Sequence, residues 1–142
     1  MEYITHSEKE TKNLAKDLAK KISFGVITLS GDLGAGKTTF VQGFAQGLGI
    51  EEKIISPTFV LIRQHLIPKL KKVLYHIDLY RLEEIKDLNT IGLNEIISDE
   101  NNIVLIEWAE KILSLLPNNI IKINIEKIDQ NSRKITISNL PF

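Results

Sequence analysis

The amino-acid sequence predicts an α/β fold, in which a mixed and mostly parallel sheet is covered by helices on both faces. Two short runs of branched apolar residues, 25–30 and 103–106, are typical of buried strands. Apolar side chains recur at helical spacing in residues 8–22 and again in residues 38–48. Alternating strand and helix patterns of this kind indicate a three-layer sandwich.

The first expected element is a helix of about four turns that begins after Ser7. Ser7 and Glu10 form a capping box, in which two side chains accept hydrogen bonds from backbone N–H groups at the start of the helix. Leu14, Leu18 and Ile22 then form an apolar stripe along one side. The pattern alone predicts a helix that covers the sheet.

The strongest motif lies between the first expected buried strand and the helix that follows it. Residues 31–38 read Gly-Asp-Leu-Gly-Ala-Gly-Lys-Thr, the G-x-x-x-x-G-K-T pattern of a phosphate-binding loop. Glycines let backbone N–H groups point into one concave nest, and the helix N-terminus adds its own N–H groups and dipole. In such a loop the lysine contacts the β- and γ-phosphates, and the following hydroxyl ligates Mg2+. The expected nucleotide-binding residues are Gly34, Ala35, Gly36, Lys37, Thr38 and Thr39.

Two further expected strands carry acidic side chains near their ends. Residues 103–106 are followed by Glu107, the Walker-B arrangement of a buried parallel strand with a carboxylate at its C-terminal end. In residues 73–81, alternation places His76 and Asp78 on one face. Polar groups there are costly in a core without partners. We therefore favour a nucleotide site over a solvent-facing sheet edge, with Asp78 either holding Mg2+ or positioning the attacking water.

The remaining segments give weaker signals. Thr58 follows a proline at the expected start of a strand, where its hydroxyl either caps the strand or reaches the γ-phosphate, as switch residues do. Residues 83–98 are expected to form helix or turn in two pieces, and residues 109–116 a short helix. Trp108, the only tryptophan, either fills the core or lines the site.

The end of the chain predicts a β-hairpin. Residues 120–128 and 134–137 alternate apolar and polar side chains on either side of a polar turn. Residues 66–72 contain three lysines and a proline, and we expect them to form a solvated turn between strands.

Composition limits the classes of function. The 142 residues, 43% hydrophobic and 25% charged, are typical of a single globular domain over residues 1–142. A formal net charge of zero predicts no general attraction to nucleic acid or membranes. The absence of cysteine excludes disulfides, thiolate catalysis and cysteine-based zinc sites. No apolar run approaches the roughly 20 residues of a membrane span, so we expect a cytoplasmic protein without a membrane partner.

The phosphate loop alone leaves the reaction open. A GTPase carries a guanine-reading N-K-x-D motif, and residues 126–129 have Glu where Asn belongs, which argues against a GTPase. A small-metabolite kinase needs an arginine-rich lid, whereas the arginines at 63, 81 and 133 form no cluster. The alternatives to an ATPase are this kinase and a nucleotide-dependent docking module in which hydrolysis is incidental.

Four segments together resemble a known family. They are the phosphate loop at 31–39, Ser-Pro-Thr-Phe at 56–59, His-Ile-Asp-Leu-Tyr-Arg at 76–81 and Ile-Glu-Trp at 106–108. In this order they closely resemble the TsaE (YjeE) family, P-loop ATPases of bacterial tRNA threonylcarbamoyladenosine biosynthesis. The resemblance covers nearly the whole chain, and the second and third segments are far more specific than the phosphate loop.

The resemblance implies a P-loop NTPase-like three-layer sandwich that binds ATP or ADP with Mg2+. It implies that Lys37 binds the phosphates and that Thr38 and Glu107 hold Mg2+. Asp78 would lie beside the γ-phosphate and orient water, and Thr58 would be the switch residue. The resemblance also implies that Glu8 and Arg133 flank the base of the nucleotide.

The resemblance implies partners as well. Two other subunits, TsaD and TsaB, would transfer the threonylcarbamoyl group to adenosine 37 of tRNA. The ATPase would reset the complex of these subunits between turnovers. The sequence shows no obvious arginine finger, with Arg81 as the one candidate, so we expect weak hydrolysis by the chain alone and stimulation by the partners. Contact with tRNA is expected only through the complex.

Overall fold

The computed structural model describes residues 1–32, 34–52, 54, 62–80 and 92–140. In that part of the chain, seven strands form one mixed sheet in the order β1-β7-β6-β2-β5-β4-β3. The four central strands are mutually parallel: β6 (Ile121–Lys127), β2 (Gly25–Ser30), β5 (Asn102–Glu107) and β4 (Lys72–Asp78). The other strands add antiparallel pairs: β1 (Glu2–Thr5), β7 (Arg133–Ser138) and β3 (Ile62–Ile67).

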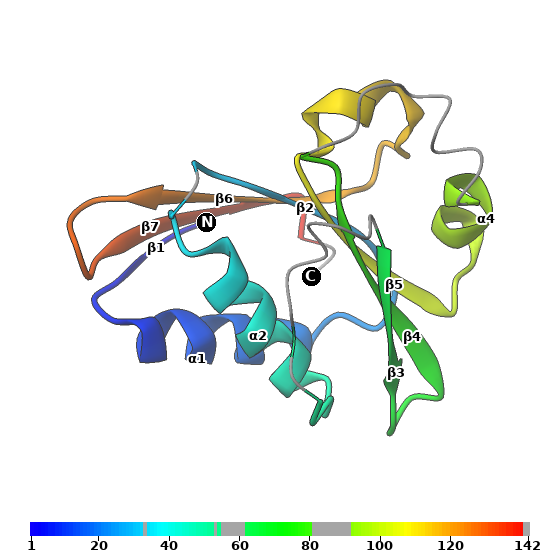
Figure 1. Cartoon of the computed structure of the whole chain (residues 1–142), viewed down its shortest axis with the longest axis horizontal. Coiled ribbons are helices and arrows are strands. Elements are labelled where there is room, and N and C mark those ends of the chain that lie inside the picture. The colour runs from blue at the N-terminus through cyan, green and yellow to red at the C-terminus, as the bar shows by residue number, and fades with distance from the viewer. Residues whose placement is uncertain (33, 53, 55–61, 81–91, 141–142) are drawn as a thin grey trace.

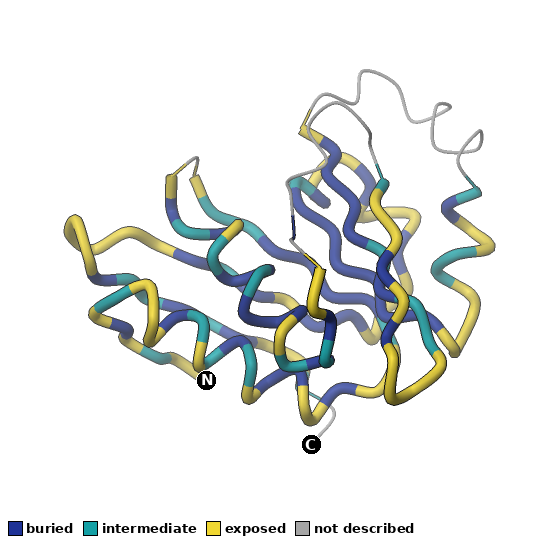
Figure 2. The backbone as a smooth tube through the Cα atoms, turned by 60° about the horizontal axis from the view of Figure 1, so that its bottom comes forward, coloured by how far each residue is buried: buried dark blue, intermediate teal, exposed yellow. Residues whose placement is uncertain are grey.

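Helices lie on both faces of this sheet (Figure 1). On one face, α1 (Glu8–Ala19) and α2 (Lys37–Gly47) pack side by side. On the other face lie α4 (Leu93–Ser98) and the 3-10 helix η1 (Ala109–Leu115). Each face has its own buried cluster, and alternate residues of β5 belong to the two clusters, so the central strands are buried on both sides (Figure 2). The expected three-layer α/β class is confirmed.

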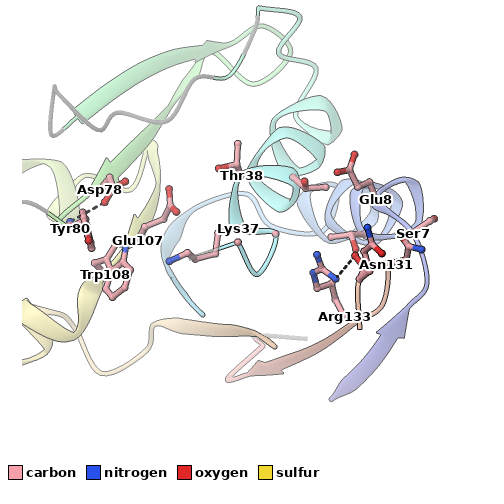
Figure 3. A pocket seen from close by; sticks show the side chains of 15 residues that line it. Ser7, Glu8, Lys37, Thr38, Asp78, Tyr80, Glu107, Trp108, Asn131 and Arg133 are labelled. Carbon is pink, nitrogen blue, oxygen red and sulfur yellow. Dashed lines mark hydrogen bonds between the residues drawn. The ribbon is translucent and has the colours of Figure 1, made fainter. Parts of the chain in front are cut away.

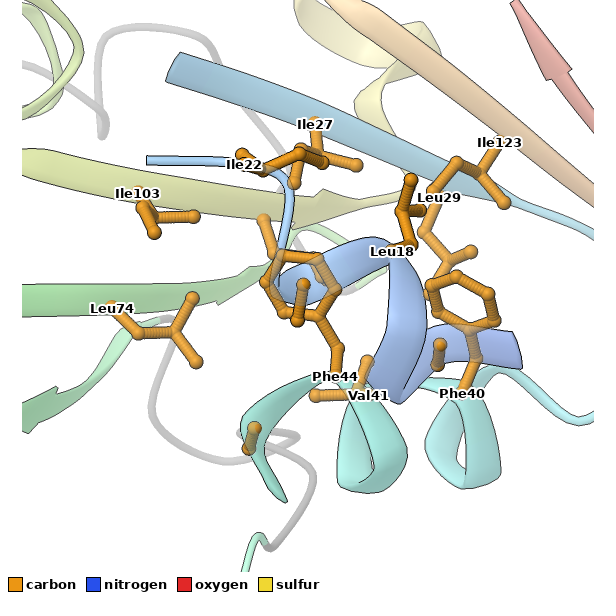
Figure 4. Close-up of a cluster of buried hydrophobic side chains, with 14 of the residues drawn as sticks. Leu18, Ile22, Ile27, Leu29, Phe40, Val41, Phe44, Leu74, Ile103 and Ile123 are labelled. Atoms are coloured by element: carbon orange, nitrogen blue, oxygen red, sulfur yellow. The ribbon is translucent and has the colours of Figure 1, made fainter. Parts of the chain in front are cut away.

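The larger buried cluster lies between the sheet and the two N-terminal helices (Figure 4). Phe40 and Phe44 of α2 share it with Ile27 and Leu29 of β2, and all four are fully buried. Full burial of a side chain of this size contributes roughly 1.5–3 kcal/mol. These contacts hold α2, and with it the loop that precedes α2, against the strand from which the loop emerges.

Several local expectations are confirmed. Ser7 caps α1, because its Oγ accepts a hydrogen bond from the Glu10 N–H at 3.1 Å. The reciprocal bond of the box is shifted by one residue, since the Glu10 carboxylate accepts from the His6 N–H at 3.0 Å. The two final strands form the expected hairpin, and α4, which Gly92 (φ +71°) precedes, is the second of the two pieces expected in residues 83–98.

Other expectations were wrong in detail. β1 was not expected, because residues 2–5 carry no apolar run; it forms by pairing with β7 at the other end of the sequence. α1 ends at Ala19, about one turn before the end of the expected apolar stripe. The short helix expected over residues 109–116 is confirmed as a 3-10 helix over residues 109–115, with a kink at Ile112 (φ −133°).

Some expectations lie outside the described residues. These are the segment that contains Thr58, the first piece of residues 83–98, and Arg81. Among the helices that are described, none has the length and apolar character that crossing a membrane requires.

Glycine at two positions of α2 permits the close approach of α1. A Cβ atom built at Gly43 would lie 2.5 Å from the carbonyl oxygen of Lys12, and one at Gly47 would collide with the carbonyl oxygen of Lys16. The obstacle at Gly43 is helix backbone, which cannot rotate away as a side chain can.

We expect Gly43→Ala to destabilise the protein by about 1–3 kcal/mol, because overpacking outweighs the better helix propensity of alanine. Urea denaturation monitored by circular dichroism measures the effect. Gln46→Ala, an exposed change on the same helix, is the control and should stay within about 0.5 kcal/mol of the wild type. An unchanged midpoint for Gly43→Ala would show that the two helices are not held as closely as described.

Candidate functional site

A pocket of about 490 Å3 lies at the carboxyl ends of the parallel strands (Figure 3). Open α/β sheets place their ligand sites at this edge. Its walls come from the loop after β2, the ends of β4 and β5, the start of α1 and the turn of the β6–β7 hairpin. The lining residues are Ser7, Glu8, Thr11, Gly34, Gly36, Lys37, Thr38, Thr39, Asp78, Tyr80, Glu107, Trp108, Gln130, Asn131 and Arg133.

The phosphate loop joins β2 to α2. Gly34 (φ +81°) and Gly36 (φ +103°) adopt the left-handed backbone region that glycine favours. Gly36 is the N-cap of α2, and neither a capping side chain nor an acidic residue in the first turn occupies the N-terminal N–H groups of the helix. Thr38 and Thr39 line the pocket, whereas Ala35 is buried. This helix end can accept an anion without a competing carboxylate.

Lys37 lies against Trp108. The lysine side chain is buried, and its Nζ is 4.1 Å from the centroid of the indole ring. The ring also packs against Tyr80 in a tilted arrangement, with a centroid distance of 5.0 Å and an interplanar angle of 50°. A cation–π contact of this kind contributes about 0.5–2 kcal/mol, depending on desolvation.

Trp108 therefore lines the pocket and does not simply fill the core, which settles the choice that the sequence left open. Its backbone is left-handed (φ +61°), an unusual conformation for a bulky residue. The residue directly follows the end of β5 and caps η1, so this backbone turn connects the strand to the 3-10 helix. No local sequence pattern predicts that turn.

Two carboxylates lie side by side at the ends of β4 and β5. Asp78 and Glu107 are directly paired across the two strands, and their exposed fractions are 7% and 4%. An oxygen of Asp78 accepts a hydrogen bond from the Tyr80 N–H at 2.9 Å, and Oε2 of Glu107 accepts one from His76 Nε2 at 2.6 Å. Asp78 of β4 thus lies at the pocket, on a strand in the interior of the sheet and not at a solvent-facing edge.

The donor set of the pocket fits a magnesium ion that is bound together with phosphate. Within the described ranges, no group of three or more His, Cys, Asp or Glu side chains could hold a metal by itself. Mg2+ at nucleotide sites commonly takes only one or two protein oxygens, and phosphate and water supply the rest. The Thr38 hydroxyl and the Glu107 carboxylate provide oxygen atoms of that kind, and both residues border the pocket (Figure 3).

The far end of the pocket is formed by α1 and the hairpin turn. Glu8 borders it from the first turn of α1, and Arg133 borders it from the start of β7. Arg133 Nε donates to the Ala35 carbonyl at 2.8 Å, and its Nη1 donates to the carbonyl of Asp129 at 2.9 Å. Backbone N–H groups of Asn131 and Ser132 hold the pKa of the Asp129 carboxyl below its usual value. Arg133 therefore connects the phosphate loop to the hairpin turn, which is itself held by hydrogen bonds to Asp129.

A family model described as "Threonylcarbamoyl adenosine biosynthesis protein TsaE" matches residues 5–135 of the chain. The chain belongs to the TsaE family. The match extends from β1 to β7 and includes the phosphate loop and both strand-end carboxylates. The resemblance inferred from the sequence is confirmed, and with it a role in the biosynthesis of threonylcarbamoyladenosine in tRNA.

Individual relatives agree over nearly the full length. The tRNA threonylcarbamoyladenosine biosynthesis protein TsaE of Rickettsia bellii is 40% identical over 138 residues, which cover 96% of this chain and 93% of the relative. The Bacillus subtilis protein of the same name is 40% identical over 142 residues, with 97% and 85% coverage. A crystal structure of YdiB from Bacillus subtilis superimposes with a TM-score of 0.77 at 35% identity, covering 96% of this chain and 83% of that one.

The structure brings most of the residues predicted for the TsaE site to one pocket. The loop residues except Ala35, both carboxylates, Glu8 and Arg133 all border it, whereas Thr58 lies outside the described residues. Sequence reasoning missed the lining roles of Thr11, Gln130 and Asn131. Their only signals were a helical position and a polar turn, and neither signal indicates what lies nearby in space.

Proposed function

We propose that this TsaE protein binds and hydrolyses ATP with Mg2+, and that it supports threonylcarbamoyladenosine formation by acting on a complex of the subunits TsaD and TsaB. The observation that carries the proposal is a phosphate loop that shares a pocket with two strand-end carboxylates. In this proposal, residues 1–142 act as a single ATPase domain, and ATP or ADP is preferred over GTP.

The phosphates are bound by the loop and by Lys37. The N–H groups at the start of α2 and the lysine ammonium neutralise phosphate charge in a partly desolvated site, where electrostatic interactions are strong. The Thr38 hydroxyl and the Glu107 carboxylate would hold Mg2+, which would neutralise phosphate charge when it is bound.

Asp78 orients the attacking water. Its pairing with the Tyr80 N–H fixes the carboxylate beside Glu107, at the end of the strand next to the proposed metal site. Phosphoryl transfer needs positioning and charge stabilisation more than covalent help from the protein, so a fixed acceptor for the water is sufficient. Thr58 stays a prediction as the switch residue.

The base lies at the end of the pocket formed by α1 and the hairpin turn. Glu8 and Arg133 flank this end. Arg133 contributes through its hydrogen bond to the Ala35 carbonyl, which couples the hairpin turn to the loop that binds the phosphates.

Hydrolysis by the chain alone is expected to be weak. Among the described residues that line the pocket, Arg133 is the only arginine. Its Nε and Nη1 already donate hydrogen bonds to backbone carbonyls. An arginine supplied by a partner can accelerate phosphoryl transfer by about 10³–10⁵-fold. Partner binding is therefore the expected route to full activity.

ATP turnover by the purified chain, measured alone and with TsaD–TsaB, and with and without tRNA, tests the proposed function. We expect slow turnover alone and strong stimulation by the partner subunits. Tight nucleotide binding without stimulated hydrolysis would instead indicate a docking module that responds to nucleotide occupancy. Phosphate transfer to a small metabolite would indicate a kinase.

We expect nucleotide binding to change the fluorescence of Trp108. The phosphates of ADP would compete with the indole ring for the Lys37 ammonium, so ADP should change the contact between Lys37 and the ring. Because Trp108 is the only tryptophan, the emission spectrum reports this contact directly. A titration with ADP should give a saturable change in intensity or emission maximum. An unchanged spectrum in a sample that binds ADP by calorimetry would contradict the movement of Lys37.

A further inference from the structure

His76 forms a buried pair with the proposed magnesium ligand Glu107. The two side chains are 1% and 5% exposed, and His76 Nε2 lies 2.6 Å from Oε2 of Glu107. His76 belongs to β4 and is paired with Leu105 of β5, so it reaches Glu107 diagonally across the two strands from two positions earlier. His76 does not line the pocket itself, whereas Glu107 does.

The position of His76 is a costly one for an imidazole. Its Nδ1 is buried and has no hydrogen-bond partner among the residues that the structure describes. A buried polar atom without a partner is unfavourable, so an apolar side chain would serve better if packing were the only requirement. The neighbour two residues earlier on the same face, Leu74, is apolar and fully buried. The hydrogen bond to Glu107 is what distinguishes His76 from a core residue.

We infer that His76 is a positioning residue, which holds the Glu107 carboxylate by one oxygen so that the other oxygen is presented to Mg2+ in the pocket. A carboxylate at the end of a side chain can rotate about its last bond, and a donor on one oxygen removes that freedom. Partners that orient metal ligands in this way typically change metal affinity about 10–100-fold when they are removed. This inference rests on the proposed function, because it takes Glu107 as a magnesium ligand.

Three variants separate positioning from packing. His76→Leu removes the donor and places an apolar side chain in the buried site. His76→Asn keeps a polar group, but its amide is too short to reach the place of Nε2. His76→Gln is the matched variant that restores a donor, because its amide nitrogen can occupy the place of Nε2. If the leucine variant fails to fold, the comparison of His76→Asn with His76→Gln carries the test.

The measurement is ADP affinity by calorimetry, in EDTA and across a series of Mg2+ concentrations. We expect His76→Leu and His76→Asn to raise the Mg2+ concentration needed for half of the metal-dependent gain in affinity by about 10–100-fold. Metal-free ADP affinity should stay within about twofold of the wild type, and His76→Gln should recover most of the Mg2+ response.

Two outcomes would overturn the inference. One is an unchanged Mg2+ response in the leucine and asparagine variants, and the other is an equal loss of affinity with and without Mg2+, which a packing defect alone would cause. Failure of the proposed function is distinguishable, because the wild type would then show no effect of Mg2+ on ADP binding. Thermal unfolding of each variant, recorded without ligand, separates the loss of stability from the loss of metal response.

Discussion

Lys37→Ala is expected to lower ATP turnover by about 10²–10³-fold or more, the loss typical when one preorganised electrostatic donor is removed. It should also weaken ADP binding by about 10–100-fold, because hydrogen bonds to charged groups contribute about 1.5–3 kcal/mol. The physical reason is the position of the lysine. It follows the N-cap of α2, is buried at the pocket and lies close enough to Trp108 to contact the ring.

The control for Lys37→Ala removes the same charge at a remote site. Lys20 lies at the C-terminal end of α1, is exposed and does not line the pocket, so Lys20→Ala should leave turnover and ADP affinity unchanged. The Lys37 variant should also have a different tryptophan spectrum before any nucleotide is added. Full turnover in Lys37→Ala would reject the site assignment.

Glu107→Gln is expected to remove most of the effect of Mg2+ on nucleotide binding. Glutamine has nearly the same shape and can still accept the hydrogen bond from His76, but it lacks the negative charge that a hard cation prefers. Affinity for Mg2+–ADP should fall by about 10–100-fold, while the affinity for metal-free ADP changes little. Titrations with ADP in the presence and absence of Mg2+ measure both.

Glu110 provides the matched control for this substitution. It lies three residues further along the chain, in η1, and it is exposed, so Glu110→Gln removes the same charge from outside the pocket. That variant should behave as the wild type in both titrations. Equal losses with and without Mg2+ in Glu107→Gln would argue against direct ligation of the metal.

The parts of the site that could be predicted from the sequence are those that depend on local patterns. The phosphate loop needs glycines and a lysine at fixed spacing, and the Glu107 strand needs an apolar run that ends in an acid. The Ser7 cap is specified within four residues and is confirmed by the hydrogen bond from the Glu10 N–H. Each of these patterns is contained in one short segment, so single-sequence reasoning finds it.

The parts that could not be predicted depend on contacts between distant segments. β1 exists because residues 2–5 pair with residues 133–136, more than a hundred positions later. The left-handed backbone of Trp108 and its contact with Lys37 arise where β5 and the phosphate loop meet. The pairing of His76 with Glu107 follows from the parallel register of β4 and β5, which alternation within one strand does not specify.

The most direct test of the central claim, a pocket that binds Mg2+ with an adenine nucleotide, is a calorimetric titration of the unmodified chain. ADP and ATP should each bind saturably at one site per chain, with higher affinity in Mg2+ than in EDTA, and GTP should bind more weakly. No saturable binding of ADP or ATP under either condition, in protein shown to be folded, would contradict the account.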